Sequence, residues 1–273
     1  MRHCWRGKKV GNLKELETMK KVTAGIISGY GINAGEELGA AFNKAGAEVE
    51  FIHIHDLLEN PAILLGYSIL GFPGGFSFGD HLGSGKVLSH LLKKNLGESL
   101  NQYLADPNHL VLGICNGFQT IVKMGLVPDL NGNHEQQASL INNESGNFID
   151  KWVQLRCNES NKSPWLSGIS DMKVPIRHGE GCFMVENDQI GDELLRQNLV
   201  AFYYEGENPN GAWLGIAGIT NTTGRILGMM PHPEAYNQPD QDPGFKRGVS
   251  VENWTTDGMR LFSNAVAYCR LEH

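Results

Sequence analysis

The sequence has few cysteines, and their positions argue against two kinds of site. Five occur among 273 residues, an odd number, and no two of them stand in a C-x-x-C spacing. A disulfide framework that pairs every cysteine is thereby excluded, and a cysteine-ligated zinc site has no support. Such usage is typical of a reducing cytoplasm, where we expect the protein to work. The five are Cys4, Cys115, Cys157, Cys182 and Cys269.

Basic residues and long apolar runs are also scarce. Lys and Arg total 23 against 30 Asp and Glu, which gives a formal net charge of −7. A large nucleic-acid interface needs a basic face that displaces phosphate counterions, so no nucleic-acid partner is expected. No apolar stretch reaches the roughly 18–20 residues of a membrane span, and the N-terminal segment lacks the apolar core of a secretory signal. We therefore expect no membrane association.

Glycine, in contrast, is abundant. The chain has 34 glycines in 273 residues, against an average usage of about 7%. They gather at a few points between apolar runs, as expected where loops bring backbone N–H groups close to a ligand. With 41% hydrophobic residues, the chain can also bury a substantial core.

The order of apolar runs and helical patterns predicts an α/β fold. Apolar runs at residues 22–28, 48–54, 67–72 and 109–114 are typical of buried parallel strands, and helical patterns lie between them. The half after residue 129 has more short strands and a last helical pattern at 257–268. The sequence therefore predicts a mostly parallel central sheet covered on both faces, with an added β-rich region in the second half.

No repeat, low-complexity tract or linker divides the chain, so residues 19–270 are expected to form a single domain. Residues 1–18 precede the first strand-like run and are interpreted as an N-terminal extension. Residues 271–273, Leu-Glu-His, are typical of the start of a vector-derived histidine tag.

The most informative segment surrounds Cys115. A buried strand is expected to run into Gly-Ile-Cys-Asn-Gly at residues 113–117, and a helix-forming stretch follows. This is the G-x-nucleophile-x-G turn of hydrolases, with cysteine in place of serine. The glycines permit a tight turn that raises the side chain to the N-terminus of the next helix, which favours a thiolate. The alternative is a small buried cysteine in a glycine-rich turn.

A thiolate nucleophile needs a base, and the base needs an orienting group. His232 and Glu234 lie two residues apart after the strand expected at 226–230. In an extended segment such residues project to the same side, and Pro233 is expected to keep the segment extended and non-helical. Cys115 and His232 are distant in sequence, so only the fold can join them. A solvated loop is the alternative for an isolated His-x-Glu.

A third glycine-rich segment, residues 71–80, follows the strand expected at 67–72. In a parallel sheet this loop opens at the same edge as the cysteine turn, where such folds bind ligands. Its glycines can offer an N–H to a developing oxyanion, together with the N–H of Asn116. A flexible surface loop is the alternative. A Walker phosphate loop is excluded, because Lys86 is followed by Val87 where Ser or Thr is required.

Other functions remain open on these residues alone. Residues 29–35 read G-x-G-x-x-x-G, and Glu50 lies near the end of the second strand, a near match to a dinucleotide-binding motif. A cysteine peptidase or related hydrolase would share the cysteine turn, although nothing indicates a peptide groove. A regulatory subunit would keep the fold without turnover, and it would not need Cys, His and Glu together. His53 and His55 alternate along an expected strand without a third ligand, so no metal site is predicted.

Six segments resemble the class I glutamine amidotransferases, and within them the glutaminase subunits of the phosphoribosylformylglycinamidine synthase family of purine synthesis. The similarity runs from about residue 20 to about residue 268. Cys-x-Gly-x-Gln and His-x-Glu are shared by the whole class, whereas the full set in this order is specific to the purine family. The segments are PGGFSFGD with LGSGK (73–86), GICNGFQ (113–119), ESGNF with KWV (144–153), HGEGCF (178–183), NPNGA (208–212) and GRILGMMPHPE (224–234).

The resemblance implies a flavodoxin-like three-layer α/β fold and an enzyme that hydrolyses glutamine through a cysteine thioester to glutamate and ammonia. It implies Cys115 as nucleophile, His232 as base and Glu234 as the orienting group. Further roles implied by the resemblance are oxyanion donors at Gly75 and Asn116, and glutamine contacts at Gly74, Gln119, His178, Gly179 and Glu180.

The resemblance also implies partners. Ammonia would pass to a large synthetase subunit that uses ATP and Mg²⁺ to convert formylglycinamide ribonucleotide to its amidine, and a small third subunit accompanies it in many systems. No cofactor is expected in this chain. Ala34, Asn147 and Ala235 depart from residues common in the family. Because none of them is a triad residue, we expect these departures to affect interface contacts and not the chemistry.

Overall fold

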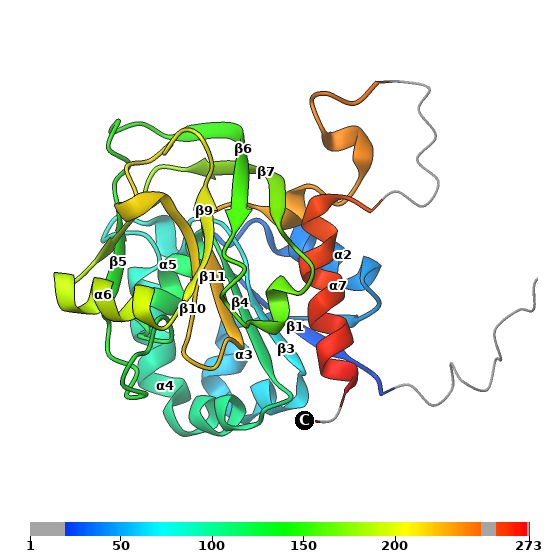
Figure 1. The fold of residues 1–273 in the computed structure, drawn as a ribbon. Coiled ribbons are helices and arrows are strands. Elements are labelled where there is room, and N and C mark those ends of the chain that lie inside the picture. Colours follow the sequence, from blue (N-terminus) through cyan, green and yellow to red (C-terminus); the bar gives the residue numbers. More distant parts are fainter. Residues whose placement is uncertain (1–19, 247–254, 272) are drawn as a thin grey trace, which may run out of the picture.

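A computed structural model describes residues 20–246, 255–271 and 273 (Figure 1). The N-terminal extension predicted at 1–18 lies outside these residues. The helices are α2 (Gly35–Lys44), α3 (Ile54–Glu59), α4 (Lys86–Ala105), α5 (Asn116–Lys123), α6 (Asp188–Arg196) and α7 (Asp257–Arg270). The strands are β1 (Thr23–Ser28), β2 (Glu48–His53), β3 (Ile69–Phe72), β4 (Leu110–Ile114), β5 (Ala138–Ile141), β6 (Ile149–Cys157), β7 (Asp171–His178), β8 (Cys182–Val185), β9 (Val200–Tyr204), β10 (Ile216–Thr220) and β11 (Ile226–Met229).

One nine-stranded sheet runs through the described part of the chain, in the order β2-β1-β3-β4-β11-β10-β9-β6-β7. The strands from β2 to β11 pair in parallel, and we call them the parallel half. From β11 onward every pairing is antiparallel, and β10, β9, β6 and β7 form the antiparallel half. The predicted β-rich region thus continues the central sheet. β5 and β8 form a separate two-stranded sheet.

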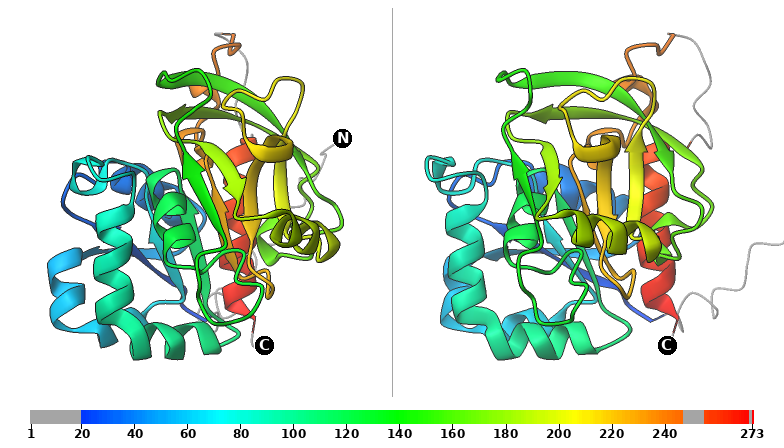
Figure 2. Two further views of the ribbon diagram at one scale, coloured as in Figure 1. Left: turned by 90° about the vertical axis from the view of Figure 1, so that its left-hand side faces the viewer. Right: turned by 60° about the vertical axis from the view of Figure 1, so that its left-hand side comes forward.

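Helices cover both faces of the parallel half, which gives three layers (Figure 2). α2 and α7 pack against each other on one face, with the rings of Phe42 and Phe262 edge to face at 5.0 Å. α4 and α5 pack together on the other face, where α5 contacts β3, β4 and β11. Every residue of β3, β4 and β11 is buried, as the continuous apolar runs of these strands require.

The predicted strands and helices are present, with boundaries that differ by a few residues, and several short elements were not predicted. α3 begins directly after β2, so His55 lies in a helix and does not alternate with His53 along a strand as expected. The reason is local: the His53 side chain accepts a hydrogen bond from the His55 N–H (3.2 Å) and caps that helix. In the described residues, no helix has the length and apolar character that a membrane crossing requires.

Three neighbouring parallel strands end at the same edge of the sheet. β3 leads into the glycine-rich loop at 73–85, β4 leads into Cys115, and β11 leads into the segment that contains His232. The register pairs Phe72 with Gly113 and Met229 with Ile114, so the three strand ends lie side by side. This edge is where parallel α/β sheets bind ligands.

Candidate active site

The cysteine turn forms as predicted. β4 leads into Cys115, and α5 begins at Asn116. Cys115 has φ 52° and ψ −108°, a conformation that residues with a side chain rarely adopt. Two glycines make the turn possible. A Cβ at residue 113 would lie 2.9 Å from the backbone of Gly117, and a Cβ at residue 117 would lie 1.9 Å from the carbonyl oxygen of Phe72.

His232 and Glu234 form a buried pair just beyond β11. Nδ1 of His232 lies 2.6 Å from Oε1 of Glu234, and the two side chains are 2% and 0% exposed. The prediction of an extended segment was wrong, because Pro233–Ala235 forms one turn of 3₁₀ helix, η5. The fixed φ of proline suits the first position of a helical turn as well as an extended chain. The predicted contact between imidazole and carboxylate forms nevertheless.

Cys115 and His232 meet around Gly74. A Cβ at residue 74 would lie 2.7 Å from Cε1 of His232 and 3.4 Å from Cβ of Cys115. Burial by itself lowers the pKa of His232, but the Glu234 carboxylate and the Cys115 sulfur outweigh burial and raise that pKa above its usual range. Sγ of Cys115 also lies 3.7 Å from the carbonyl oxygen of Arg177, to which the thiol donates. The arrangement favours the imidazolium form of His232, next to the Cys115 sulfur.

The loop after β3 is fixed by the loop after β1. Ile32 and Gly75 form an antiparallel bridge, and the Ala34 N–H donates to the Gly74 carbonyl (3.1 Å). Gly75 has φ 152°, and a Cβ there would lie 2.8 Å from the backbone of residues 31–33. Within the described residues the Gly75 N–H donates no hydrogen bond, which leaves it available to a ligand.

Residues 29–35, the near match to a dinucleotide motif, have a structural role here. The Phe76 N–H donates to the Gly31 carbonyl (2.9 Å), and the Phe78 N–H donates to the Tyr30 carbonyl (2.7 Å). Glu50, the carboxylate of that motif, accepts a hydrogen bond from the Tyr67 hydroxyl (2.9 Å). These contacts account for the motif without a nucleotide.

The side chain of Asn116 links the cysteine turn to the surrounding loops. Its Oδ1 accepts from the Ser77 N–H (3.3 Å), and its Nδ2 lies 3.2 Å from Oδ1 of Asp80 and 3.1 Å from Oε1 of Gln119. Nε2 of Gln119 in turn donates to the Glu180 carbonyl (2.6 Å). One polar chain therefore connects the glycine-rich loop, the start of α5 and the segment after β7.

The segment from residue 178 to 181, which includes the last residue of β7 and leads to β8, is held largely by Asn143. Nδ2 of Asn143 donates to the His178 carbonyl (2.8 Å), and Oδ1 accepts from the Gly181 N–H (2.9 Å). The Asn143 N–H donates to the Gly179 carbonyl (2.9 Å). Oε2 of Glu180 accepts from the Ser84 N–H (3.2 Å), which ties this segment to the glycine-rich loop across the pocket.

His178 is a buried, neutral imidazole. Burial lowers its pKa to about 3, and the neighbouring His232 has a smaller effect in the same direction. Its Nε2 lies 3.1 Å from Nδ2 of Asn210 and accepts the amide proton, so the ring carries its own proton on Nδ1. In the described structure that Nδ1 has no hydrogen-bond partner.

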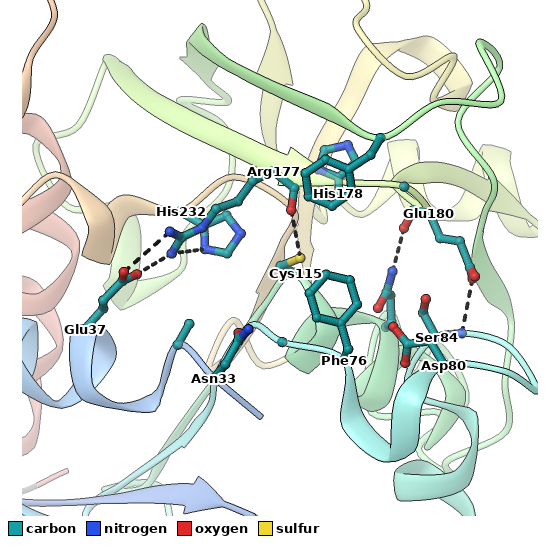
Figure 3. Close-up of a pocket in the computed structure, with 15 residues that line it drawn as sticks. Asn33, Glu37, Phe76, Asp80, Ser84, Cys115, Arg177, His178, Glu180 and His232 are labelled. Atoms are coloured by element: carbon teal, nitrogen blue, oxygen red, sulfur yellow. Dashed lines mark hydrogen bonds and ion pairs between the residues drawn. The ribbon is translucent and has the colours of Figure 1, made fainter. Parts of the chain in front are cut away.

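These groups surround one pocket of about 370 Å³ (Figure 3). Seven of the predicted site residues line it: Gly75, Cys115, Gln119, His178, Gly179, Glu180 and His232. Gly74, Asn116 and Glu234 lie directly behind this lining, in contact with it through the bonds described above. All the predicted residues therefore gather at one place.

Eight further residues line the pocket that the sequence motifs did not predict as site residues. Arg177 comes directly before the HGEG segment, on β7, where buried and half-buried residues alternate. In the sequence, the charged residue beside this segment was the one sign of a role for Arg177. Ala34 lines the pocket and its N–H donates to the Gly74 carbonyl, so this departure from the family pattern lies at the site. Its effect on interface contacts stays a prediction. The other lining residues are Asn33, Glu37, Phe76, Asp80, Ser84 and Phe148.

In the part of the chain that the structure describes, the cysteines form no disulfide. Cys115, Cys157, Cys182 and Cys269 are free and buried, while Cys4 lies outside the described residues. Across the described ranges, no group of three or more His, Cys, Asp or Glu side chains is placed to hold a metal ion.

Comparison with known proteins identifies the class of protein to which this chain belongs. The model of the CobB/CobQ-like glutamine amidotransferase domain matches residues 21–269, so the chain belongs to the glutamine amidotransferases. A glutamine amidotransferase from Thermotoga maritima, 19% identical with a TM-score of 0.50, has a similar fold. The predicted fold class is confirmed, and the site at the carboxyl edge of the parallel strands agrees with it.

Closer relatives then give the particular family. The PurQ subunit of phosphoribosylformylglycinamidine synthase from Dehalococcoides mccartyi is 36% identical over 262 residues, which cover 92% of this chain and 99% of that one. PurQ from Methanococcus maripaludis is 36% identical over 263 residues, covering 89% and 96%. A chain of the PurLQS structure from Thermotoga maritima superposes with a TM-score of 0.70 at 27% identity, covering 91% and 99%. This chain is a member of the PurQ family, and it is a glutamine amidotransferase.

Proposed function

We propose that this chain hydrolyses glutamine in the pocket around Cys115 and supplies the ammonia to a synthetase subunit. The observation that carries the proposal is the meeting of the cysteine turn with the buried His232–Glu234 pair around Gly74. A nucleophile, a base and an orienting carboxylate in contact are what thioester chemistry requires.

The first half of the reaction forms the thioester. The Cys115 thiolate attacks the side-chain carbonyl carbon of glutamine, a C–S bond forms, and the carbonyl oxygen becomes an oxyanion. The N–H groups of Gly75 and Asn116 stabilise that oxyanion. His232 then donates its proton to the amide nitrogen, the C–N bond breaks, and ammonia leaves a γ-glutamyl thioester on the sulfur.

The second half regenerates the enzyme. His232, now neutral, accepts a proton from water, and the oxygen attacks the thioester carbonyl. The C–S bond breaks, glutamate leaves, and the thiolate–imidazolium pair is restored. Glu234 keeps a proton on Nδ1 of His232 through both halves, so that Nε2 is the nitrogen that exchanges protons with substrate and water.

The amino-acid end of glutamine is assigned to the opposite end of the pocket. Gln119 and the backbone of residues 178–180 offer hydrogen-bonding groups there, with Gly74 giving room between the nucleophile and the base. Asp80 and Glu180 place carboxylates at this end, which suits the α-ammonium group. Burial raises the pKa of Asp80, and the nearby Glu180 adds to the rise, so a cation between them would relieve their repulsion.

The product determines the partners. Ammonia is mostly protonated in neutral water, so it must pass directly to a second active site. We assign that site to a large synthetase subunit that uses ATP and Mg²⁺ to form formylglycinamidine ribonucleotide, with a small third subunit in the assembly. The relatives support this, since they are subunits of that synthase and of PurLQS. A free thiol nucleophile suits the reducing cytoplasm. We also assign residues 19–270 to one domain, which is supported by the single sheet that both halves of the described chain share.

The test uses the complex reconstituted with the synthetase subunits of the same organism. Cys115→Ala is expected to abolish glutamine-dependent synthesis, by about four orders of magnitude, and to leave ammonia-dependent synthesis intact. Intact mass should show a γ-glutamyl adduct on the wild-type chain and none on the variant. Retained glutamine-dependent turnover in Cys115→Ala would remove this residue from its role.

A further inference from the structure

An ion pair that belongs to neither the triad nor the glutamine contacts stands directly beside His232. Arg177, near the end of β7, pairs with Glu37 in the first turn of α2 through Nη1 and Nη2 of its guanidinium group (Figure 3). Its Nη2 also lies 3.5 Å from Nδ1 of His232, while its backbone oxygen is the one that faces Sγ of Cys115. One residue thus touches both partners of the proton transfer.

Local stability does not explain this placement. The Arg177 and Glu37 side chains are 34% and 43% exposed, and ion pairs at that exposure add little to folding. Nδ1 of His232 already has Glu234 as its partner, so the guanidinium acts there through its charge. A cation at this place disfavours the imidazolium of His232 and favours the thiolate of Cys115. Glu37 offsets that cation from the other side.

We propose that Arg177 is a positioning residue whose charge, balanced by Glu37, sets the pH range in which the Cys115–His232 pair exists as thiolate and imidazolium. The proposal rests on the proposed glutaminase function. Arg177 alone would move that range downward, and Glu37 moves it back up. The pair also joins α2, which covers the parallel half, to β7 of the antiparallel half. A change in the distance between these two elements would therefore change this pH range.

The other charged groups on the elements around His232 do not contact its ring. The elements that pack on η5 are α2, α7 and β7. On β7, His178 faces His232 and is neutral, and Lys173 is bound to Asp242. The other charged groups on these elements have other surroundings. On α2, Glu36 is exposed and Lys44 contacts the Asn237 carbonyl. Asp171 of β7 accepts from Gln154 and Ser170, Asp257 of α7 accepts from the Lys173 N–H, Arg260 donates to the Gly168 carbonyl and Arg270 donates to the Gly46 carbonyl. Glu234 and Cys115 are in direct contact with His232, and Arg177, paired with Glu37, is the cation placed beside it.

The experiment is the pH profile of glutaminase kcat for the assembled complex. In Arg177→Gln both limbs are expected to move up by roughly half a pH unit or more, and in Glu37→Gln both are expected to move down by a similar amount. On the alkaline limb this corresponds to about a threefold higher and a threefold lower rate, respectively. Arg177→Lys keeps the charge and should restore most of the wild-type profile. Arg196→Gln, which breaks an exposed pair with Glu193 on α6, is the matched control and should leave the profile unchanged.

Shifts of Arg177→Gln and Glu37→Gln in the same direction, or a fall in kcat with no shift, would overturn the proposal and leave a purely structural pair. A rise in KM alone would also overturn it, because Arg177 would then contact glutamine. The proton NMR titration of the His232 ring in the isolated chain gives a readout that needs no turnover. It should show the same opposite shifts even if glutamine hydrolysis itself were absent, which separates failure of this proposal from failure of the proposed function.

Discussion

In the parallel half of the sheet, the residues assigned to the chemistry stand at the ends of three neighbouring strands, within a few residues of each strand end. Of the residues assigned to glutamine binding, Gly74 and Gln119 also belong to this half, whereas His178, Gly179 and Glu180 stand in one segment at the end of β7, in the antiparallel half. Backbone register fixes the first set. Side-chain hydrogen bonds, chiefly from Asn143 and Gln119, fix the second.

The difference between the halves predicts different effects of substitutions on kcat and KM. Groups set by strand register are placed rigidly, and their loss removes stabilisation of the transition state. Groups held by a few side-chain hydrogen bonds can shift by a fraction of an ångström at lower cost. We therefore expect changes in the parallel half to act mainly on kcat and changes in the antiparallel half to act mainly on KM for glutamine.

Apart from loss of the nucleophile itself, the largest effect should come from Glu234→Gln in the parallel half. The amide cannot stabilise the imidazolium, and it allows the wrong tautomer of His232, so kcat should fall by about 10²–10⁴. KM should change little, because Glu234 lies behind the pocket wall. Steady-state glutaminase kinetics measure both values. A KM effect larger than the kcat effect would contradict the division between the halves.

Gly74→Ala should have the next largest effect. Its Cβ would stand 2.7 Å from Cε1 of His232, so the imidazole must move away from Cys115 and kcat should fall by about 10–100-fold. Gly97→Ala is the control, because Gly97 is an exposed position of α4 and nothing lies within 4 Å of the added Cβ. It should leave kcat unchanged and raise the free energy of unfolding by about 0.5–1 kcal/mol. Equal kinetics for both variants would show that Gly74 does not separate the two groups.

Asn143→Ala tests the antiparallel half. It leaves the His178 carbonyl and the Gly181 N–H without their partner, so the segment 178–181 should loosen and KM for glutamine should rise by about tenfold. A smaller change in kcat is expected. The free energy of unfolding, measured by urea denaturation, should fall by about 1–3 kcal/mol. An unchanged KM would mean that this segment does not hold the substrate.

The smallest effect is the contribution of His178 to the loss of stability at acidic pH. Its folded-state pKa of about 3 lies below the unfolded value of about 6.5, so the unfolded chain binds the proton more readily. The stability contributed by the neutral ring is therefore present above pH 6.5 and is lost as the pH falls below it, at up to about 1.4 kcal/mol per pH unit. In His178→Asn, the free energy of unfolding measured by urea denaturation should fall less steeply between about pH 7 and pH 5 than in the wild type. His90→Asn, at an exposed position, should keep the wild-type slope.

The sequence allowed the chemistry to be predicted better than its surroundings. Cys115, His232 and Glu234 lie in short motifs whose spacing reflects local geometry, and continuous apolar runs marked β1, β3 and β4. α3 and the β5–β8 sheet are too short for a periodic pattern. The Glu37–Arg177 contact joins residues 140 positions apart, so no motif could show it. The turn at Pro233 was mispredicted because proline suits both of the competing conformations.

The backbone of Cys115 has a final consequence for the stability of the fold. A residue held with φ 52° and ψ −108° costs about 1–3 kcal/mol, against a total of roughly 5–15 kcal/mol for a typical domain. The closely packed glycines at 113 and 117 and the fully buried strand β4 must maintain that distortion whether or not substrate is present. The conformation of the nucleophile is therefore pre-formed and lowers the free energy of unfolding. A relative that works at high temperature would need additional stabilising contacts elsewhere in its core.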